Sequence, residues 1–127
     1  TNRYIKIYDR VRKSMAATYV NIDVDQGADF NITINLKDNL NNQFNLTGYT
    51  VASQMRKNYT SSVATTFVAT HDNTGGHITL SLTNTVTALL QPGQYLYDVE
   101  ITDGTGKKKR VIEGIATVTP GITRIWQ

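Results

Sequence analysis

The chain has 127 residues, of which 39% are hydrophobic, and it carries a formal net charge of +3. A chain of this length can fold as one domain without a covalent staple, and the absence of cysteine excludes disulfides and thiolate metal sites. No stretch is apolar enough to cross a bilayer, and the start of the chain alternates charged with apolar residues, unlike a signal peptide. We therefore expect synthesis in a cytoplasm and no membrane partner.

The positive charge is concentrated at the start of the chain. Residues 1–15 hold five cations and one anion, a balance of +4, whereas residues 16–127 hold eight cations and nine anions, a balance of −1. In residues 4–8, two isoleucines alternate with tyrosine and lysine, as the side chains of a strand added to a sheet would. We predict that residues 1–15 form an attachment arm that contacts neighbouring subunits, and that its removal leaves the domain folded with little change in melting temperature. A solvated, disordered tail is the alternative. The interacting residues of this arm would be Arg3, Tyr4, Ile5, Lys6, Ile7, Tyr8, Arg10, Arg12 and Lys13.

Apolar residues recur at every second position through most of the remaining chain, which predicts half-buried strands. Seven strands are expected, at residues 18–24, 30–36, 50–56, 64–70, 77–82, 95–102 and 109–118. Only residues 83–93 break this pattern. There Thr83 or Thr85 can cap a short helical turn near residues 84–90, which Pro92 and Gly93 would end.

This succession of strands predicts an all-β fold, an antiparallel immunoglobulin-like β-sandwich spanning residues 16–124. A small barrel would give a similar pattern. Residues 125–127 would form a C-terminal tail, in which Trp126 is a candidate interface anchor. We expect Tyr49, Tyr59, Tyr95 and Tyr97 to supply core, with their hydroxyls at its rim.

Residues 103–106 (DGTG) predict a hairpin turn between the last two strands, with Gly104 at a positive φ angle. The favoured interpretation of the cations that follow is charge pairing with Asp98 and Glu100 on the opposite strand, and a nucleic-acid site is the alternative. These cations are Lys107, Lys108, Lys109 and Arg110.

The sequence offers little catalytic or metal chemistry. His71, Asp72 and His77 flank one turn, but two histidines without a third strong ligand are usually solvated loop residues. Asp23 and Asp25 lack the later carboxylates of a calcium loop. The cationic hairpin arm should keep Asp98 and Glu100 ionised, and no serine lies in a GxSxG motif. We predict no catalytic residue, no cofactor and no metal.

Four segments resemble a known family. They are LTGYT at residues 46–50, QMRK at 54–57, GxYxYDVEI at 93–101 and EGxxTVTPGxTR at 113–124. In this order they resemble the β-sandwich domain of tailed-phage structural proteins, at the N-terminus of baseplate upper proteins and in small virion proteins of marine and cyanobacterial phages. The resemblance covers residues 18–124.

The resemblance implies a non-enzymatic structural protein of the virion, made in the cytoplasm of a bacterial host and present in several copies among other virion proteins. Baseplate upper proteins continue into receptor-binding parts, whereas this sequence stops soon after PGITR. We therefore expect an adaptor or joining subunit of the tail or baseplate, with capsid decoration as the alternative. A nucleic-acid-binding module that uses the arm and the hairpin is the alternative of another class, and the absence of aromatic residues interleaved with basic ones on any one predicted strand of the sandwich argues against it.

Overall fold

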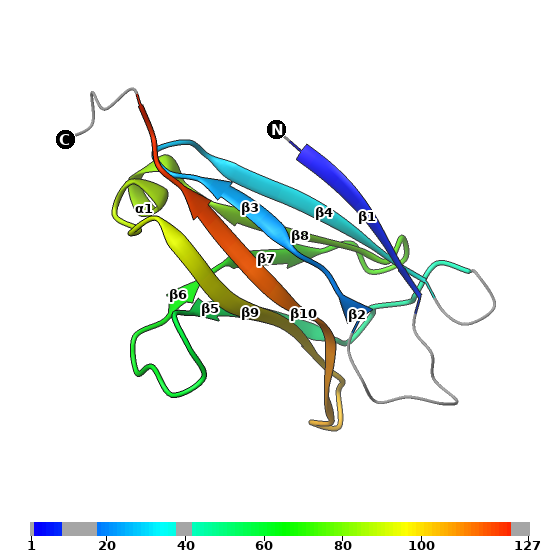
Figure 1. Ribbon diagram of the computed structural model, residues 1–127. Helices are drawn as coiled ribbons and strands as arrows, with labels where there is room; N and C mark the ends of the chain where they lie inside the picture. Colours follow the sequence, from blue (N-terminus) through cyan, green and yellow to red (C-terminus); the bar gives the residue numbers. More distant parts are fainter. Residues whose placement is uncertain (1, 9–17, 38–41, 123–127) are drawn as a thin grey trace.

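The computed structural model describes residues 2–8, 18–37 and 42–122, which form two facing sheets and one short helix (Figure 1). The strands are β1 (Asn2–Tyr8), β2 (Thr18–Tyr19), β3 (Ile22–Asp25), β4 (Phe30–Lys37), β5 (Thr50–Arg56), β6 (Thr65–Thr66), β7 (Val68–His71), β8 (His77–Leu82), β9 (Gly93–Thr102) and β10 (Lys108–Thr119). The helix is α1 (Asn84–Ala88). The all-β sandwich predicted from the sequence is confirmed.

The strands divide into a four-stranded and a six-stranded sheet. The four-stranded sheet has the order β1-β4-β8-β7, and the six-stranded sheet has the order β2-β10-β9-β5-β6, with β3 also paired to β10. Three pairings are parallel, namely β1 with β4, β2 with β10 and β3 with β10. The sandwich is therefore mixed rather than purely antiparallel, because its first strands are added beside β4 and β10 without hairpins to join them.

The core lies between the two sheets, where alternate apolar side chains of each strand meet. On β4, Ile32, Ile34 and Leu36 are at most 2% exposed, as expected from the alternation of residues 30–36. Their counterparts in the six-stranded sheet include Val99 and Ile112, which are fully buried. Among the described residues, the buried hydrophobic core extends from Ile22 to Val118.

Two of the predicted strands are interrupted in the structure. The expected strand at 64–70 splits around Phe67, where the chain leaves the six-stranded sheet as β6 and enters the four-stranded sheet as β7. Phe67 is 2% exposed, and its ring centroid lies 5.8 Å from that of Phe30 and 6.2 Å from that of Tyr97. The expected strand at 18–24 likewise splits into β2 and β3. β2 and β3 both pair with β10, so only the break at Phe67 is a change of sheet. Alternation of apolar residues does not indicate either break, because it reports only the direction of successive side chains.

The predicted helical turn is present as α1, but it is capped differently from the prediction. Thr83 occupies the N-cap position without a side-chain cap bond. Instead Asp29 Oδ1 accepts hydrogen bonds from the backbone N and the Nδ2 atom of Asn84, at 2.7 and 3.0 Å. The fully buried Thr87 hydroxyl donates to the Ala28 carbonyl at 2.8 Å, so α1 is fixed to the connection between β3 and β4.

No helix among the described residues is long and apolar enough to cross a membrane.

The β9–β10 hairpin forms where the sequence predicts it, but with a different glycine in the strained position. Asp103 Oδ1 accepts hydrogen bonds from the backbone N and hydroxyl of Thr105, at 2.9 and 2.7 Å, and from the backbone N of Lys107 at 3.0 Å. Gly106 has a φ angle of 90°, whereas Gly104 is not among the glycines at positive φ. The expectation for Gly104 is therefore wrong. The residue at positive φ is Gly106, near the end of the turn, and not the residue that directly follows Asp103.

Three of the four tyrosines predicted to supply core do so. Tyr97 is 4% exposed and donates its hydroxyl to the Val20 carbonyl at 2.6 Å, and Tyr49 and Tyr95 pack against the core partly buried. Tyr59 is 85% exposed, so its predicted burial is wrong. It lies beyond the end of β5, in the loop that leads to β6, where no facing sheet covers it.

Candidate functional site

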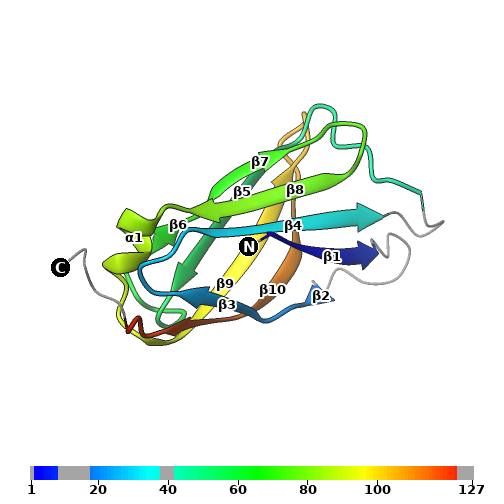
Figure 2. The ribbon, with the colours of Figure 1, turned by 90° about the horizontal axis from the view of Figure 1, so that it is seen from above.

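Residues 2–8 of the predicted arm form β1 at the edge of the four-stranded sheet (Figure 2). β1 runs parallel to β4, with Ile5 in register with Ile34 and Ile7 in register with Leu36. The sandwich thus includes residues that the sequence assigns to the arm, and contact with neighbouring subunits stays a prediction. The remaining predicted contacts Arg10, Arg12, Lys13 and Trp126 lie outside the described residues.

A row of polar side chains crosses the outer face of the six-stranded sheet. Strand pairing places five residues side by side in the order Tyr19, Glu113, Asp98, Gln54 and Thr66, one from each of β2, β10, β9, β5 and β6. Cross-strand neighbours point to the same face of a sheet. They line a hollow of about 500 Å³, which we call the outer hollow. Its lining also includes Ala52, Ser53, Arg56, Asn58, Tyr59, Leu96, Tyr97, Glu100, Arg110 and Gly114.

Arg110 links the carboxylates of the outer hollow. Its Nε atom lies 3.3 Å from Asp98 Oδ2, and its Nη1 atom lies 3.5 Å from Glu113 Oε1. Glu100 is the register partner of Arg110 across the β9–β10 pair. The charge pairing expected for the hairpin is thus confirmed for Arg110. Lys107 and Lys108 are exposed, as Arg110 is, and Lys109 is half-buried.

The pKa of the Asp98 carboxyl is shifted in the direction opposite to that expected from the cationic hairpin arm. Partial burial raises the pKa of the Asp98 carboxyl, and the nearby Glu100 carboxylate raises this pKa further, against the opposing effect of Arg110. The reasoning from the sequence considered only the hairpin cations and treated the outer face of β9 as open to water. Folding places two further carboxylates and the wall of the outer hollow around Asp98.

Two polar side chains of the outer hollow are held by hydrogen bonds within the protein. Its buried hydroxyl, Ser53, donates to the Asp98 carbonyl oxygen at 2.6 Å and is 2% exposed, so it is held as a structural group. Arg56 donates to the Ser61 carbonyl at 2.7 Å and to Gln54 Oε1 at 3.1 Å. The exposed rings of Tyr19 and Tyr59 remain at the margin, where they offer apolar contact.

Sequence reasoning missed the outer hollow. Alternation alone shows that Gln54, Asp98 and Glu113 face away from the core. It does not show that β5, β9 and β10 are neighbours, which is what brings the three side chains together.

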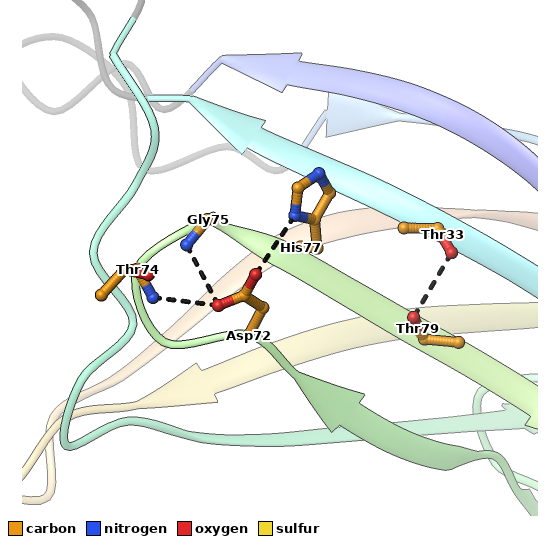
Figure 3. Close-up of polar contacts among 6 residues, drawn as sticks. All are labelled: Thr33, Asp72, Thr74, Gly75, His77 and Thr79. Atoms are coloured by element: carbon orange, nitrogen blue, oxygen red, sulfur yellow. Dashed lines mark hydrogen bonds and ion pairs between the residues drawn. The ribbon is translucent and has the colours of Figure 1, made fainter.

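The turn between β7 and β8 brings Asp72 and His77 together (Figure 3). His77 Nδ1 lies 3.7 Å from Asp72 Oδ2, and Asp72 Oδ1 accepts hydrogen bonds from the backbone N atoms of Thr74 and Gly75, each at 3.2 Å. These backbone hydrogen bonds lower the pKa of the Asp72 carboxyl, with the largest effect from Gly75, and His77 lowers this pKa further. In the part of the chain that the structure describes, no group of three histidine, cysteine or acidic residues is placed to hold a metal ion.

Comparison with solved structures shows where this fold occurs. The N-terminal domain of phage TP901-1 ORF48 aligns with a TM-score of 0.61 over 93% of this chain and 98% of that chain, at 10% identity. The Listeria monocytogenes internalin-like protein lmo2027 (TM-score 0.48, 21% identity, 81% of this chain and 28% of that one) and the bradyzoite-specific antigen BSR4 from Toxoplasma gondii (0.42, 8%, 91% and 48%) are less similar. No protein-family model matches the chain, and no curated protein sequence matches it. At such low identity, the first alignment shows a shared fold with a phage protein domain and nothing about its chemistry.

Proposed function

We propose that the protein is a non-enzymatic structural protein of a bacteriophage virion, acting in the tail or baseplate as an adaptor or joining subunit. The observation that carries this proposal is the likeness to the N-terminal domain of phage TP901-1 ORF48, which extends over nearly the whole of both chains. The sequence resemblance to tailed-phage β-sandwich domains over residues 18–124 supports the same role.

The chemistry of the surface is consistent with a joining subunit. The outer hollow presents carboxylates, a guanidinium group and exposed tyrosines on one sheet face, which suits a polar protein interface. The basic N-terminal segment is the second proposed contact, and the exposed Lys107 and Lys108 of the hairpin are the third. We also retain Trp126 as a proposed contact.

Capsid decoration is the second candidate within the same class, because it needs the same multiple copies and protein contacts. The nucleic-acid-binding alternative is less well supported. Arg110, the last cation of the hairpin, is paired with Asp98 and Glu113. These two carboxylates lie beside the hairpin cations to which phosphates would have to bind, and they would repel phosphates.

Mass spectrometry of separated tails and capsids, prepared from the phage that encodes the chain, tests the proposal. We expect peptides of this protein in the tail fraction, at a constant ratio to known tail subunits. Recovery only with capsids would favour decoration instead. Absence from both fractions, with the protein detected in infected cells, would reject a virion role.

A further inference from the structure

The outer hollow has the dimensions of a site for a small ligand. Its volume of about 500 Å³ lies within the range of pockets that hold small molecules, roughly 300 to 1,000 Å³. Its floor is the outer face of β10, β9 and β5, which place Glu113, Asp98 and Gln54 side by side on strands about 4.8 Å apart. Because sites built on strands are more precise than sites on loops, the floor presents these polar groups in a defined arrangement.

The charges of the outer hollow are largely paired with one another. Its lining contains three carboxylates and two guanidinium groups, a balance of −1. Arg110 contacts Asp98 Oδ2 at 3.3 Å and Glu113 Oε1 at 3.5 Å. Arg56 donates to the Ser61 carbonyl at 2.7 Å. An anionic ligand would meet an excess of carboxylates, and a cationic ligand would find only one uncompensated negative charge, so the hollow favours a ligand without net charge.

Hydrogen-bonding capacity remains on the floor after these pairings. Arg110 contacts one oxygen of each carboxylate, and the side chains of Asp98 and Glu113 are still 36% and 35% exposed. The second oxygen of each can therefore accept a hydrogen bond from a ligand. The Gln54 amide donates one N–H to Thr66 Oγ1 at 3.2 Å, which leaves its second N–H as a donor. Neighbouring donors and acceptors match hydroxyl groups, because a hydroxyl both donates and accepts.

Two exposed tyrosine rings line the same hollow. Tyr19 on β2 is 61% exposed, and it is the cross-strand neighbour of Glu113. Tyr59, in the loop that follows β5, is 85% exposed. A single exposed aromatic residue is ordinary, but two beside one polar floor offer rigid apolar contact area at a low cost in conformational entropy. The C–H face of a sugar ring packs against such a ring while its hydroxyls reach the floor.

We propose that the outer hollow binds an uncharged saccharide of one or two sugar units, with hydroxyls on Asp98, Glu113 and Gln54 and one ring face against Tyr19. The combination of paired charges, remaining donors and acceptors, and exposed aromatic rings selects this class of ligand. The inference goes beyond the proposed function, because it assigns a small ligand to a surface for which subunit contacts require only polar groups.

Titration of the full chain with neutral disaccharides tests the inference. The probes are maltose, lactose, cellobiose and diacetylchitobiose, each added to isotope-labelled protein while the backbone amide NMR signals are recorded. We expect at least one probe to bind with a dissociation constant of about 1 mM or lower and to shift signals of β5, β9 and β10. Because these ligands carry no charge, raising the salt concentration about tenfold should change this constant by less than about twofold.

Variants of Tyr19 separate ring packing from a general effect on the fold. We expect Tyr19→Ala to raise the dissociation constant about fivefold or more, and Tyr19→Phe to keep it within about twofold, because phenylalanine retains the ring. Val68→Ala is the matched control, since Val68 is an exposed residue of a short strand in the other sheet and does not line the hollow. Glu113→Gln should raise the constant about threefold, because it removes a charged acceptor. Melting temperatures check that each variant is folded.

Three outcomes would overturn the saccharide site. In the first, none of the four probes binds at concentrations up to about 20 mM. In the second, a probe binds but Tyr19→Ala and Glu113→Gln bind it as the wild type does. In the third, a triarginine peptide binds in place of the saccharides, more weakly at high salt and not to Glu113→Gln, which would assign the hollow to a basic protein partner. Mass spectrometry of tails and capsids tests the virion role separately, so either result can fail without the other.

Discussion

Gly104 and Gly106 lie two residues apart in the β9–β10 turn, yet they differ in backbone conformation. Gly106 has a φ angle of 90°, which L-residues with a side chain rarely adopt, and Gly104 is not at positive φ. We expect Gly106→Ala to lower the free energy of unfolding by about 1 kcal/mol, and Gly104→Ala to change it by no more than about 0.5 kcal/mol. Urea unfolding of both variants measures the difference. Equal effects would contradict the assignment of the turn.

Asp103 organises the same turn, and its contribution should depend on pH. A hydrogen bond from the Thr105 hydroxyl, followed by one from the Lys107 backbone, lowers the pKa of the Asp103 carboxyl below its value in the unfolded chain. Its stabilising effect is therefore present above the unfolded pKa and is lost as the pH falls through the folded pKa. We expect the melting temperature of the wild type to exceed that of Asp103→Asn at pH 7, and the gap to narrow toward pH 3. A gap independent of pH would contradict this prediction.

At the scale of elements, Gly114 allows the β2–β3 segment to pass close to β10. A Cβ atom at this position would collide with the Val20 carbonyl oxygen. That segment is held by hydrogen bonds from Val20 N to the Glu113 carbonyl at 2.9 Å and from Ile115 N to Asn21 Oδ1 at 3.1 Å. We expect Gly114→Ala to cost about 2 kcal/mol or more, because the segment must move away from β10. Urea unfolding with Gly104→Ala as the control measures this, and an unchanged midpoint would show that the crossing is not tight.

At the scale of the whole molecule, the pairing of β1 with β4 changes the expectation for a truncated chain. A chain starting at Ala16 keeps all the described buried core, which lies between Ile22 and Val118, so we expect it to fold. Its uncovered β4 edge should lower the melting temperature and cause association that grows with concentration. Circular dichroism melting and size-exclusion chromatography at several concentrations measure these effects. An unchanged melting temperature in a monomeric truncated protein would show that β1 adds nothing to the sandwich.

The sequence by itself determined which segments form strands and where the last hairpin turns. Residues 50–56 and 77–82 were predicted with the bounds that β5 and β8 have, because alternation reports a local property of the backbone, the opposite directions of successive side chains. The turn at Asp103 is equally local, since it depends on hydrogen bonds within five residues.

Apart from the last hairpin, only the tertiary structure decided which strands are neighbours. The sequence did not indicate the change of sheet at Phe67 or the row that joins Gln54, Asp98 and Glu113. It also did not show that residues 2–8 lie beside β4. Strand order results from burying apolar faces contributed by segments far apart in the chain, and many orders satisfy the same alternation. The outer hollow and the edge covered by β1 are products of that order, so they appear only when the sheets are assembled.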